Sequence, residues 1–244
     1  MRSRKLLLFS CVLAIFLSAC KKPGCIGSAG SVTTVTRDLN SFNKLVLDSK
    51  INLVLTQGTI NKIEITAPKN IEPNITSIIK GDSLTIRNDG DCGWMRNPGE
   101  TVTVHLYFTT LRDINYKGSG TITNTDTLRL EHLQIQSFTG AGNIELTLDN
   151  IYTGAYIMLE SAGIKLHGKS VSCFTYTNAR GQADMRDFTV KRMVIEYGGL
   201  ADTYVNVTED LNAILYYKGN IYYSGNPVIS KNVSYSTGKL INVP

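Results

Sequence analysis

The sequence is poor in the residues that build metal and catalytic centres. Among 244 residues there are three histidines, five cysteines and one tryptophan, and no two cysteines form a CxxC pair. Structural zinc sites need closely spaced cysteine and histidine ligands, so we expect no metal and no cofactor. His105, His132 and His167 each alternate with apolar neighbours that point inward, which predicts outward-facing histidines on distant strands.

Long apolar runs and clustered basic charge are also missing. The formal net charge is +5, but Arg2, Arg4 and Lys5 supply three of the 25 basic residues; without them 22 basic residues face 20 acidic ones, a net charge of +2. Binding to nucleic acid needs basic residues clustered on one face, so we expect no nucleic-acid partner. The apolar stretch Leu6 to Leu17 has twelve residues, too few for a helix that spans a bilayer.

The N-terminus nevertheless carries a specific signal for export. A basic flank and the apolar stretch lead into Leu17-Ser18-Ala19-Cys20, a tetrad that resembles the lipobox of bacterial lipoproteins. The resemblance implies that residues 1–19 are a signal peptide and that Cys20 carries the lipid (palmitate-type acyl chains). Two or three such chains anchor a protein stably, so we expect a lipid-anchored envelope protein, at the outer membrane, with the periplasmic or surface side open. The alternative is an ordinary signal peptide with a chance cysteine.

The remaining cysteines and the next segment suit an exported chain. Residues 20–35 are short of apolar periodicity and contain Pro23, Gly24, Gly27 and Gly30, which predicts a flexible tether. Cys173 alternates with inward apolar residues and should be a buried small hydrophobe. Cys25 and Cys92 both lie in glycine-rich loops; whether they form a disulfide stays open.

The mature part of the chain has the composition of strands and turns. Thr, Asn, Gly, Ile, Val and Tyr are abundant, and helix-favouring runs are scarce. Residues 36–113 form an N-terminal β-strand region with apolar residues at every second position, as in Ile51-Asn52-Leu53-Val54-Leu55. A long loop from Asn88 to Glu100 interrupts this region and holds Trp94.

The region 114–244 is an internal repeat. A corner motif recurs with its third position at 120, 142, 163, 181, 200, 219 and 238, in steps of 22, 21, 18, 19, 19 and 19 residues. This position is glycine in every copy except the fifth, which has Leu200. Periods in this range indicate a solenoid. The glycines assigned to its turns are Gly118, Gly120, Gly140, Gly142, Gly163, Gly181, Gly219 and Gly238.

One repeat can hold two strands and two corners. Glycine is expected at the first corner because that turn demands a positive φ and because stacked corners leave no room for Cβ atoms. A second, softer corner is expected near Asn150, Gly168, Asp210 and Gly225. Successive rungs stack at about 4.8 Å and stabilise one another. We therefore predict an all-β fold, a right-handed parallel β-helix with two facing sheets.

The repeat also supports a family resemblance. The corners, the segment Tyr217 to Pro227 (YKGNIYYSGNP) and Ser236 to Lys239 (STGK) resemble the putative auto-transporter adhesin head-GIN-domain family, over residues 36–244. The resemblance implies a pectin-lyase-like β-helix, a lipoprotein typical of Bacteroidetes, a role in cell adhesion and no catalytic residues. Only the turn glycines carry over residue by residue.

Aromatic residues give the signal for binding. Tyrosines crowd the last repeats, and alternation sends some of them outward; we select Trp94, Tyr197, Tyr217 and Tyr223 as candidate binding residues. The alternatives are an aromatic ladder that only fixes register, and a Trp94 that packs on the core.

Three functions remain open from the sequence. The first is a non-enzymatic adhesion or binding module for glycan or a surface protein. The second is a polysaccharide-active β-helix enzyme (a lyase or hydrolase), for which Glu160, Asp184 and Asp202 follow corners on different rungs. The third is a purely structural envelope protein. The oligomeric state cannot be read from the sequence.

Overall fold

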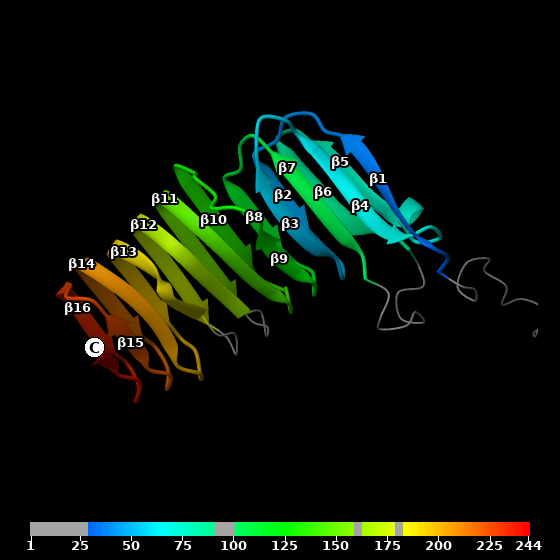
Figure 1. The fold of residues 1–244 in the computed structure, drawn as a ribbon. Helices are drawn as coiled ribbons and strands as arrows, with labels where there is room; N and C mark the ends of the chain where they lie inside the picture. The colour runs from blue at the N-terminus through cyan, green and yellow to red at the C-terminus, as the bar shows by residue number, and fades with distance from the viewer. Residues whose placement is uncertain (1–28, 91–100, 159–162, 179–182) are drawn as a thin grey trace, which may run out of the picture.

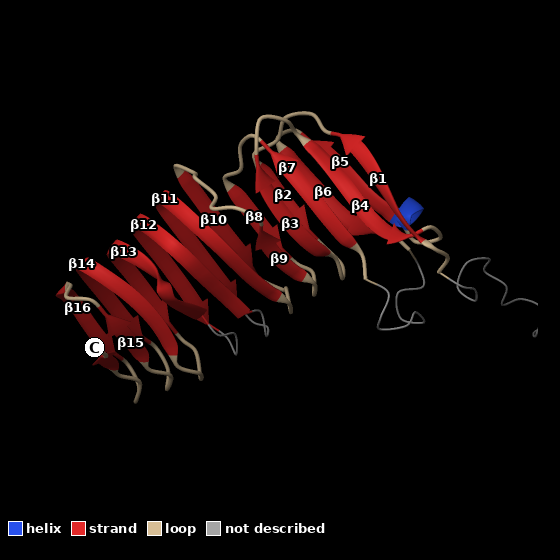
Figure 2. Ribbon diagram, in the orientation of Figure 1, coloured by secondary structure: helices blue, strands red, loops and turns tan. Residues whose placement is uncertain are grey.

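The computed structural model describes residues 29–90, 101–158, 163–178 and 183–244. They form a β-solenoid of about six turns (Figure 1), and strands dominate the described chain (Figure 2). Its only helix, within those ranges, is the short 3-10 helix η1 (Glu72–Asn74). The prediction of an all-β solenoid is confirmed.

The described residues form seventeen strands, and four of these strands are long enough to pass from one face to the other. In chain order they are β1 (Val32–Asp38), β2 (Lys44–Leu47), β3 (Asn52–Gln57), β4 (Lys62–Pro68), β5 (Ile75–Lys80), β6 (Ser83–Asn88), β7 (Thr103–Phe108), β8 (Asp113–Tyr116), β9 (Thr121–Asn124), β10 (His132–Ser137), β11 (Asn143–Met158), β12 (Gly163–Asn178), β13 (Ala183–Tyr197), β14 (Thr203–Leu215), β15 (Ile221–Ser224), β16 (Val228–Ser234) and β17 (Leu240–Asn242).

The pairings divide the strands between two faces. Face A runs β5, β6, β2, β8, β10, then the C-terminal halves of β11 to β14, and ends with β16. Face B runs β1, β4, β7, β3, β9, then the N-terminal halves of β11 to β14, and ends with β15 and β17. Each rung thus crosses face A, turns a corner and returns along face B.

The N-terminal end departs from simple stacking. The rung formed by β2 and β3 lies between the β6–β7 rung and the β8–β9 rung, so spatial order differs from chain order. Beyond it, β5 pairs with β6, β4 with β7 and β1 with β4, all antiparallel. Terminal repeats of a solenoid must close off the core, and here antiparallel strands do so.

Alternation along the strands fills the space between the faces. The burial of β10 and of most rungs switches at every second residue, so Leu133 and Ile135 point inward while Gln134 and Gln136 point outward. Register between β11 and β12 is offset by 20 residues, with Asn143 beside Gly163. This offset lies within the period of the sequence repeat, which confirms that one repeat is one rung.

The corners differ in detail from the expectation. We predicted a positive φ at Gly142 and Gly219, and this is wrong: the glycines with positive φ include Gly168 (+92°) and Gly225 (+90°) at the opposite corner, and neither Gly142 nor Gly219. Close approach explains the corner glycines instead. A Cβ on Gly142 would lie 1.8 Å from the carbonyl oxygen of Gly120, and one on Gly219 would lie 2.2 Å from that of Ala201.

At Gly225 the second corner is a turn between β15 and β16, as expected, but in the longer strands it is not a break between two strands. The strands β11 and β12 run through it without interruption. Asn150, buried at this bend in β11, accepts a hydrogen bond from the Leu130 N–H (3.1 Å) and donates one to the Thr153 hydroxyl (3.3 Å). In β11 to β14 a bent continuous strand therefore replaces the softer turn that we expected.

Most of the other predicted turn glycines that the structure describes also lie where an added Cβ would come too close to a neighbouring atom, as at Gly142 and Gly219. Gly118, Gly120, Gly140 and Gly238 lie in corners where an added Cβ would come within 2.6 Å of another atom. Gly163 is the first residue of β12, and Gly181 lies outside the described residues. No helix in the described ranges has the length and apolar character needed to cross a membrane.

Candidate functional site

The structure does not bring the predicted binding residues together. Trp94 lies outside the described residues. Tyr217 is exposed (44%), but Tyr197 is buried (1%) and Tyr223 packs against the core. Cys20, Cys25 and Cys92 also fall outside the described ranges. Of the selected aromatic residues that the structure describes, Tyr217 is the exposed one.

Tyr197 has a structural task. Its ring lies beneath the corner glycines, within 2.9 Å of where a Cβ on Gly199 or Gly219 would be, and its hydroxyl donates a hydrogen bond to the Ala201 carbonyl oxygen. Burial raises the pKa of Tyr197 to about 12. Tyr116 does the same four rungs away, donating to the Gly120 carbonyl oxygen at 2.6 Å. These tyrosines fill the space that the corner glycines leave.

Face A carries an aromatic surface that the sequence analysis missed. Its members are Tyr152, Tyr156, Phe174 and Tyr176, on the outer side of neighbouring strands β11 and β12; Tyr156 pairs in register with Tyr176. The rings of Tyr156 and Phe174 have centroids 5.3 Å apart. We call these four residues the aromatic surface of face A.

A glycine shapes the centre of this surface. Gly154 lies between Tyr152 and Tyr156 in the strand and beside Phe174 in register, and a Cβ there would lie 3.3 Å from both tyrosine rings. Burial, with a smaller contribution from Tyr156, raises the pKa of Tyr152 to about 12. The Tyr152 phenol therefore stays neutral at physiological pH, and the rings of Tyr152 and Tyr156 cover the buried backbone at Gly154.

The aromatic character continues in both directions along face A. Towards the N-terminus, His132 stacks on Tyr152 with centroids 4.5 Å apart and planes 20° apart. Towards the C-terminus, Tyr216 stacks on Tyr235 at 5.6 Å and donates a hydrogen bond to Glu196 at 3.1 Å. The rings on β10, β11 and β12 form a row along the solenoid axis, because each rung adds about 4.8 Å. The strand β13 carries no outward ring on face A, so Tyr216 and Tyr235 form a separate pair.

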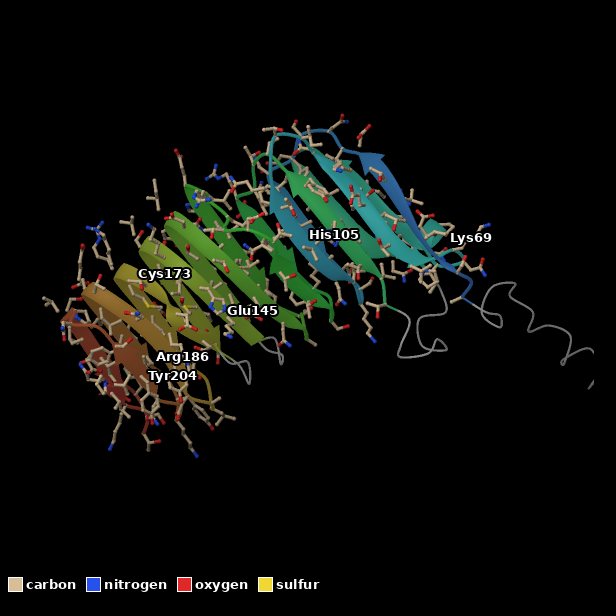
Figure 3. All side chains as sticks on the ribbon, viewed as in Figure 1. Lys69, His105, Glu145, Cys173, Arg186 and Tyr204 are labelled. Carbon is tan, nitrogen blue, oxygen red and sulfur yellow. The ribbon has the colours of Figure 1, made fainter. Side chains whose placement is uncertain are left out.

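Face B carries aromatic rings too, but they lie among paired charges (Figure 3). Tyr204 stacks on Tyr222 at 5.2 Å, and the guanidinium of Arg186 lies 4.1 Å from the Tyr204 centroid. Arg186 also pairs with Asp184 at 2.8 Å, which raises the pKa of this guanidinium. The Arg186 cation on the outer side of face B is thus already paired within the protein.

The neighbouring charges on face B form a ladder across the rungs. Glu145 accepts from His167 at 3.0 Å and pairs with Lys165 at 3.4 Å, and His167 also lies 3.6 Å from Asp187. The hydrogen bond from His167 and the charge of Lys165 lower the pKa of Glu145. Exposed pairs of this kind contribute little to stability, and they leave few unpaired charges for a ligand.

The candidate catalytic and thiol groups have simple environments. Asp184 pairs with Arg186, Asp202 accepts hydrogen bonds from the backbone and side chain of Asn220, and Glu160 lies outside the described residues. Cys173 is buried and free, as predicted, and burial raises its pKa to about 12. Across the described part of the chain, no group of three or more His, Cys, Asp or Glu side chains is placed to hold a metal ion.

The fold and this outer surface define a class of protein: a β-solenoid with an aromatic row along one face. Residues 41–227 match the family described as putative auto-transporter adhesin, head GIN domain, and the chain belongs to that family. Membership in this adhesin family indicates a protein of the cell envelope or surface that binds surface molecules. No curated protein matches the sequence.

Solved structures share the fold. A putative adhesin from Bacteroides fragilis is 22% identical, with 87% of this chain and 97% of that chain covered and a TM-score of 0.79. A putative lipid binding protein from Parabacteroides distasonis is 17% identical (88% and 98% covered, TM-score 0.66). A putative adhesin from the same species is 16% identical (88% and 98% covered, TM-score 0.62). At these identities the likeness concerns the fold alone.

Proposed function

We propose that the protein is a lipid-anchored envelope adhesin that binds glycans, without turnover, through the aromatic surface of face A. The anchor is Cys20, as its basic flank, apolar stretch and LSAC tetrad indicate. The solenoid forms the head of the adhesin, and we propose that the lipid on Cys20 inserts into the outer membrane. The observation that carries the glycan proposal is the row of rings from His132 through Tyr152, Tyr156 and Phe174.

The chemistry of this row suits sugars. Sugar rings present C–H groups on one side and hydroxyls at the edge, and an aromatic ring offers a flat apolar surface with a partly negative face. A β-solenoid keeps such rings in place, so little conformational entropy is lost on binding. An aromatic contact adds roughly 0.5–1.5 kcal/mol beyond area burial. A few contacts give weak affinity, which many anchored copies convert into strong attachment.

The test is a panel of host and bacterial polysaccharides presented to the full chain in detergent. We expect retention on at least one glycan, with no release of reducing or unsaturated ends. Phe174→Ala should reduce retention several-fold, because it removes the ring that packs beside Tyr156 on this surface. Tyr222→Ala on face B is the matched control and should bind like the wild type. Steady release of new ends, or equal loss in both variants, would contradict the proposal.

A further inference from the structure

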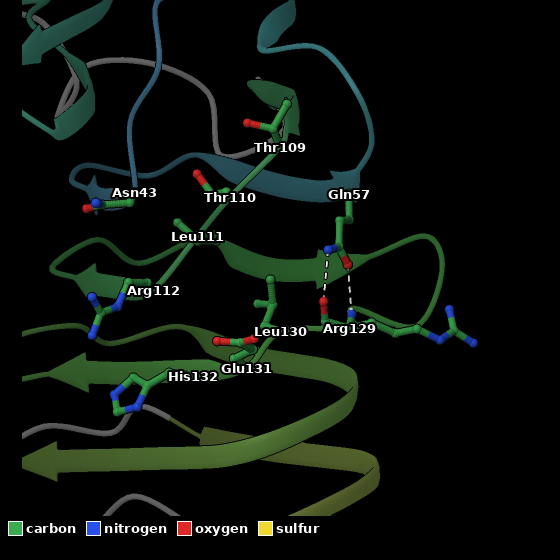
Figure 4. A pocket seen from close by; sticks show the side chains of 10 residues that line it. All are labelled: Asn43, Gln57, Thr109, Thr110, Leu111, Arg112, Arg129, Leu130, Glu131 and His132. Carbon is green, nitrogen blue, oxygen red and sulfur yellow. Dashed lines mark hydrogen bonds between the residues drawn. The ribbon is translucent and has the colours of Figure 1, made fainter.

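A pocket of about 560 Å³ opens beside the aromatic surface (Figure 4). It lies where the loop from β7 to β8 meets the loop from β9 to β10. Its lining includes Asn43, Gln57, Thr110, Arg112, Glu131 and His132. This volume is within the range typical of small-molecule sites.

Backbone and amide hydrogen bonds hold the walls of the pocket in place. The Gln57 side chain donates to the Arg129 carbonyl oxygen (2.9 Å) and accepts from the Arg129 N–H (2.7 Å). The Asn43 carbonyl oxygen accepts from the Arg112 N–H at 2.7 Å, and the Thr110 hydroxyl donates to the Phe42 carbonyl oxygen at 3.2 Å. The pocket is therefore formed before any ligand arrives.

Two arginines and one glutamate supply the charged groups that line the pocket. Arg112 and Arg129 both line it, and neither guanidinium has a hydrogen-bond or ion-pair partner within the part of the chain that the structure describes. Glu131 is the one acidic residue in the lining. In Figure 4 the guanidinium of Arg112 lies on the side of Asn43 and His132, whereas that of Arg129 points away from them. Arg112 is thus the cation available to a ligand.

Asn43 and His132 indicate which chemical groups a ligand of this pocket would need. The Asn43 Oδ1 atom is buried without a hydrogen-bond partner among the described residues, a costly state that a hydroxyl donor would relieve after rotation of the amide. His132 connects the pocket to the aromatic surface, because its ring stacks on Tyr152 at 4.5 Å. A ligand that lies along the rings can therefore reach the pocket with one of its units.

We propose that this pocket binds a carboxylate-bearing sugar unit of the glycan that lies on the aromatic surface. The planar guanidinium of Arg112 can take the carboxylate through two parallel hydrogen bonds, Asn43 accepts from a sugar hydroxyl, and His132 borders the step to Tyr152. The inference rests on the proposed function: the aromatic surface supplies binding, and the pocket selects acidic over neutral chains.

The test compares matched acidic and neutral polymers. Polygalacturonate, alginate and hyaluronan are each presented to the full chain beside their carboxyl-reduced neutral forms. We expect the wild type to prefer at least one acidic polymer about tenfold, the effect of one charge-assisted hydrogen-bond pair. The preference should shrink as salt concentration rises. Arg112→Gln should abolish it, and Arg129→Gln, the matched control, should retain it.

The outcomes separate this inference from the proposed function. Loss of preference in Arg112→Gln with residual binding to both polymer forms supports the pocket. Equal binding of acidic and neutral forms by the wild type, equal loss in both arginine variants, or binding to none of the three acidic polymers overturns it. If Phe174→Ala leaves retention unchanged on every glycan of the panel, the proposed function itself fails, whatever the arginine variants show.

Discussion

Replacing Gly142 with alanine should destabilise the solenoid strongly, although it adds one methyl group. The new Cβ would lie 1.8 Å from the Gly120 carbonyl oxygen and 2.0 Å from the Tyr116 hydroxyl oxygen. Real Cβ contacts essentially never fall below 3.0 Å, so the first neighbour must retreat by 3.0 − 1.8 = 1.2 Å. The methyl group also enters the hydrogen bond of 2.6 Å between these two oxygen atoms.

Two costs follow from this geometry. Overpacking a filled site costs about 1–3 kcal/mol, and a buried hydrogen bond left unmade costs about 1–3 kcal/mol more. We therefore expect Gly142→Ala to lower the free energy of unfolding by roughly 4 kcal/mol, which for a chain of this size lowers Tm by roughly 8–16 °C. Stacked rungs need not unfold in one step, so midpoints in urea should be compared by circular dichroism at several wavelengths.

Two further variants make the result decisive. Gly58→Ala is the control, since an added Cβ there meets nothing within 4 Å and Gly58 does not have a positive φ; it should change stability by less than about 0.5 kcal/mol. Adding Tyr116→Phe to Gly142→Ala removes one of the two clashing oxygens, so the double variant should lose less than the sum of the single losses. If Gly142→Ala is as stable as Gly58→Ala, the stacked-corner explanation is refuted.

Three other predictions concern single groups. Cys20→Ala should release the protein from the membrane fraction or leave it unprocessed, and an intact mass of the wild type without acyl chains would contradict lipidation. Tyr197→Phe should lower the free energy of unfolding by about 1–2 kcal/mol, because the Ala201 carbonyl oxygen loses its buried donor; an unchanged urea midpoint would contradict this role. Cys173, with a pKa raised to about 12, should resist thiol reagents at pH 8 until the protein unfolds, and rapid labelling of the folded chain would show that its burial is wrong.

The rungs could be predicted from the repeat, because the apolar alternation of each strand and the glycines of each corner lie within one continuous stretch of chain. The same reasoning failed at the N-terminal end. The β2–β3 rung lies between rungs that come later in the sequence, and such a placement depends on contacts between distant segments. The cap of antiparallel strands has the same alternation as the parallel rungs, so hydropathy cannot tell the two apart.

The candidate binding residues show where the inward and outward alternation along a single strand was not enough to predict the binding surface. Tyr197 shares parity with the buried Met193 and Ile195, so its inward direction was available from the sequence. Phe174 and Tyr176 alternate with buried Cys173 and Thr175, which marked them as outward. Their position beside Tyr152 and Tyr156 of β11 depends on the 20-residue register between β11 and β12, which the sequence of one strand does not show. The pocket at Asn43 and Arg112 joins loops without any periodic signal.

Hydroxyl-radical labelling of tyrosine and phenylalanine rings tests the central claim most directly. The full chain is labelled alone and with a glycan that the polysaccharide panel retains. Contact through the aromatic surface of face A predicts that labelling of Tyr152, Tyr156 and Phe174 falls on addition of the glycan, while labelling of Tyr204 and Tyr222 on face B stays the same. Protection of Tyr204 and Tyr222 with unchanged face A rings would contradict the assignment of the binding surface.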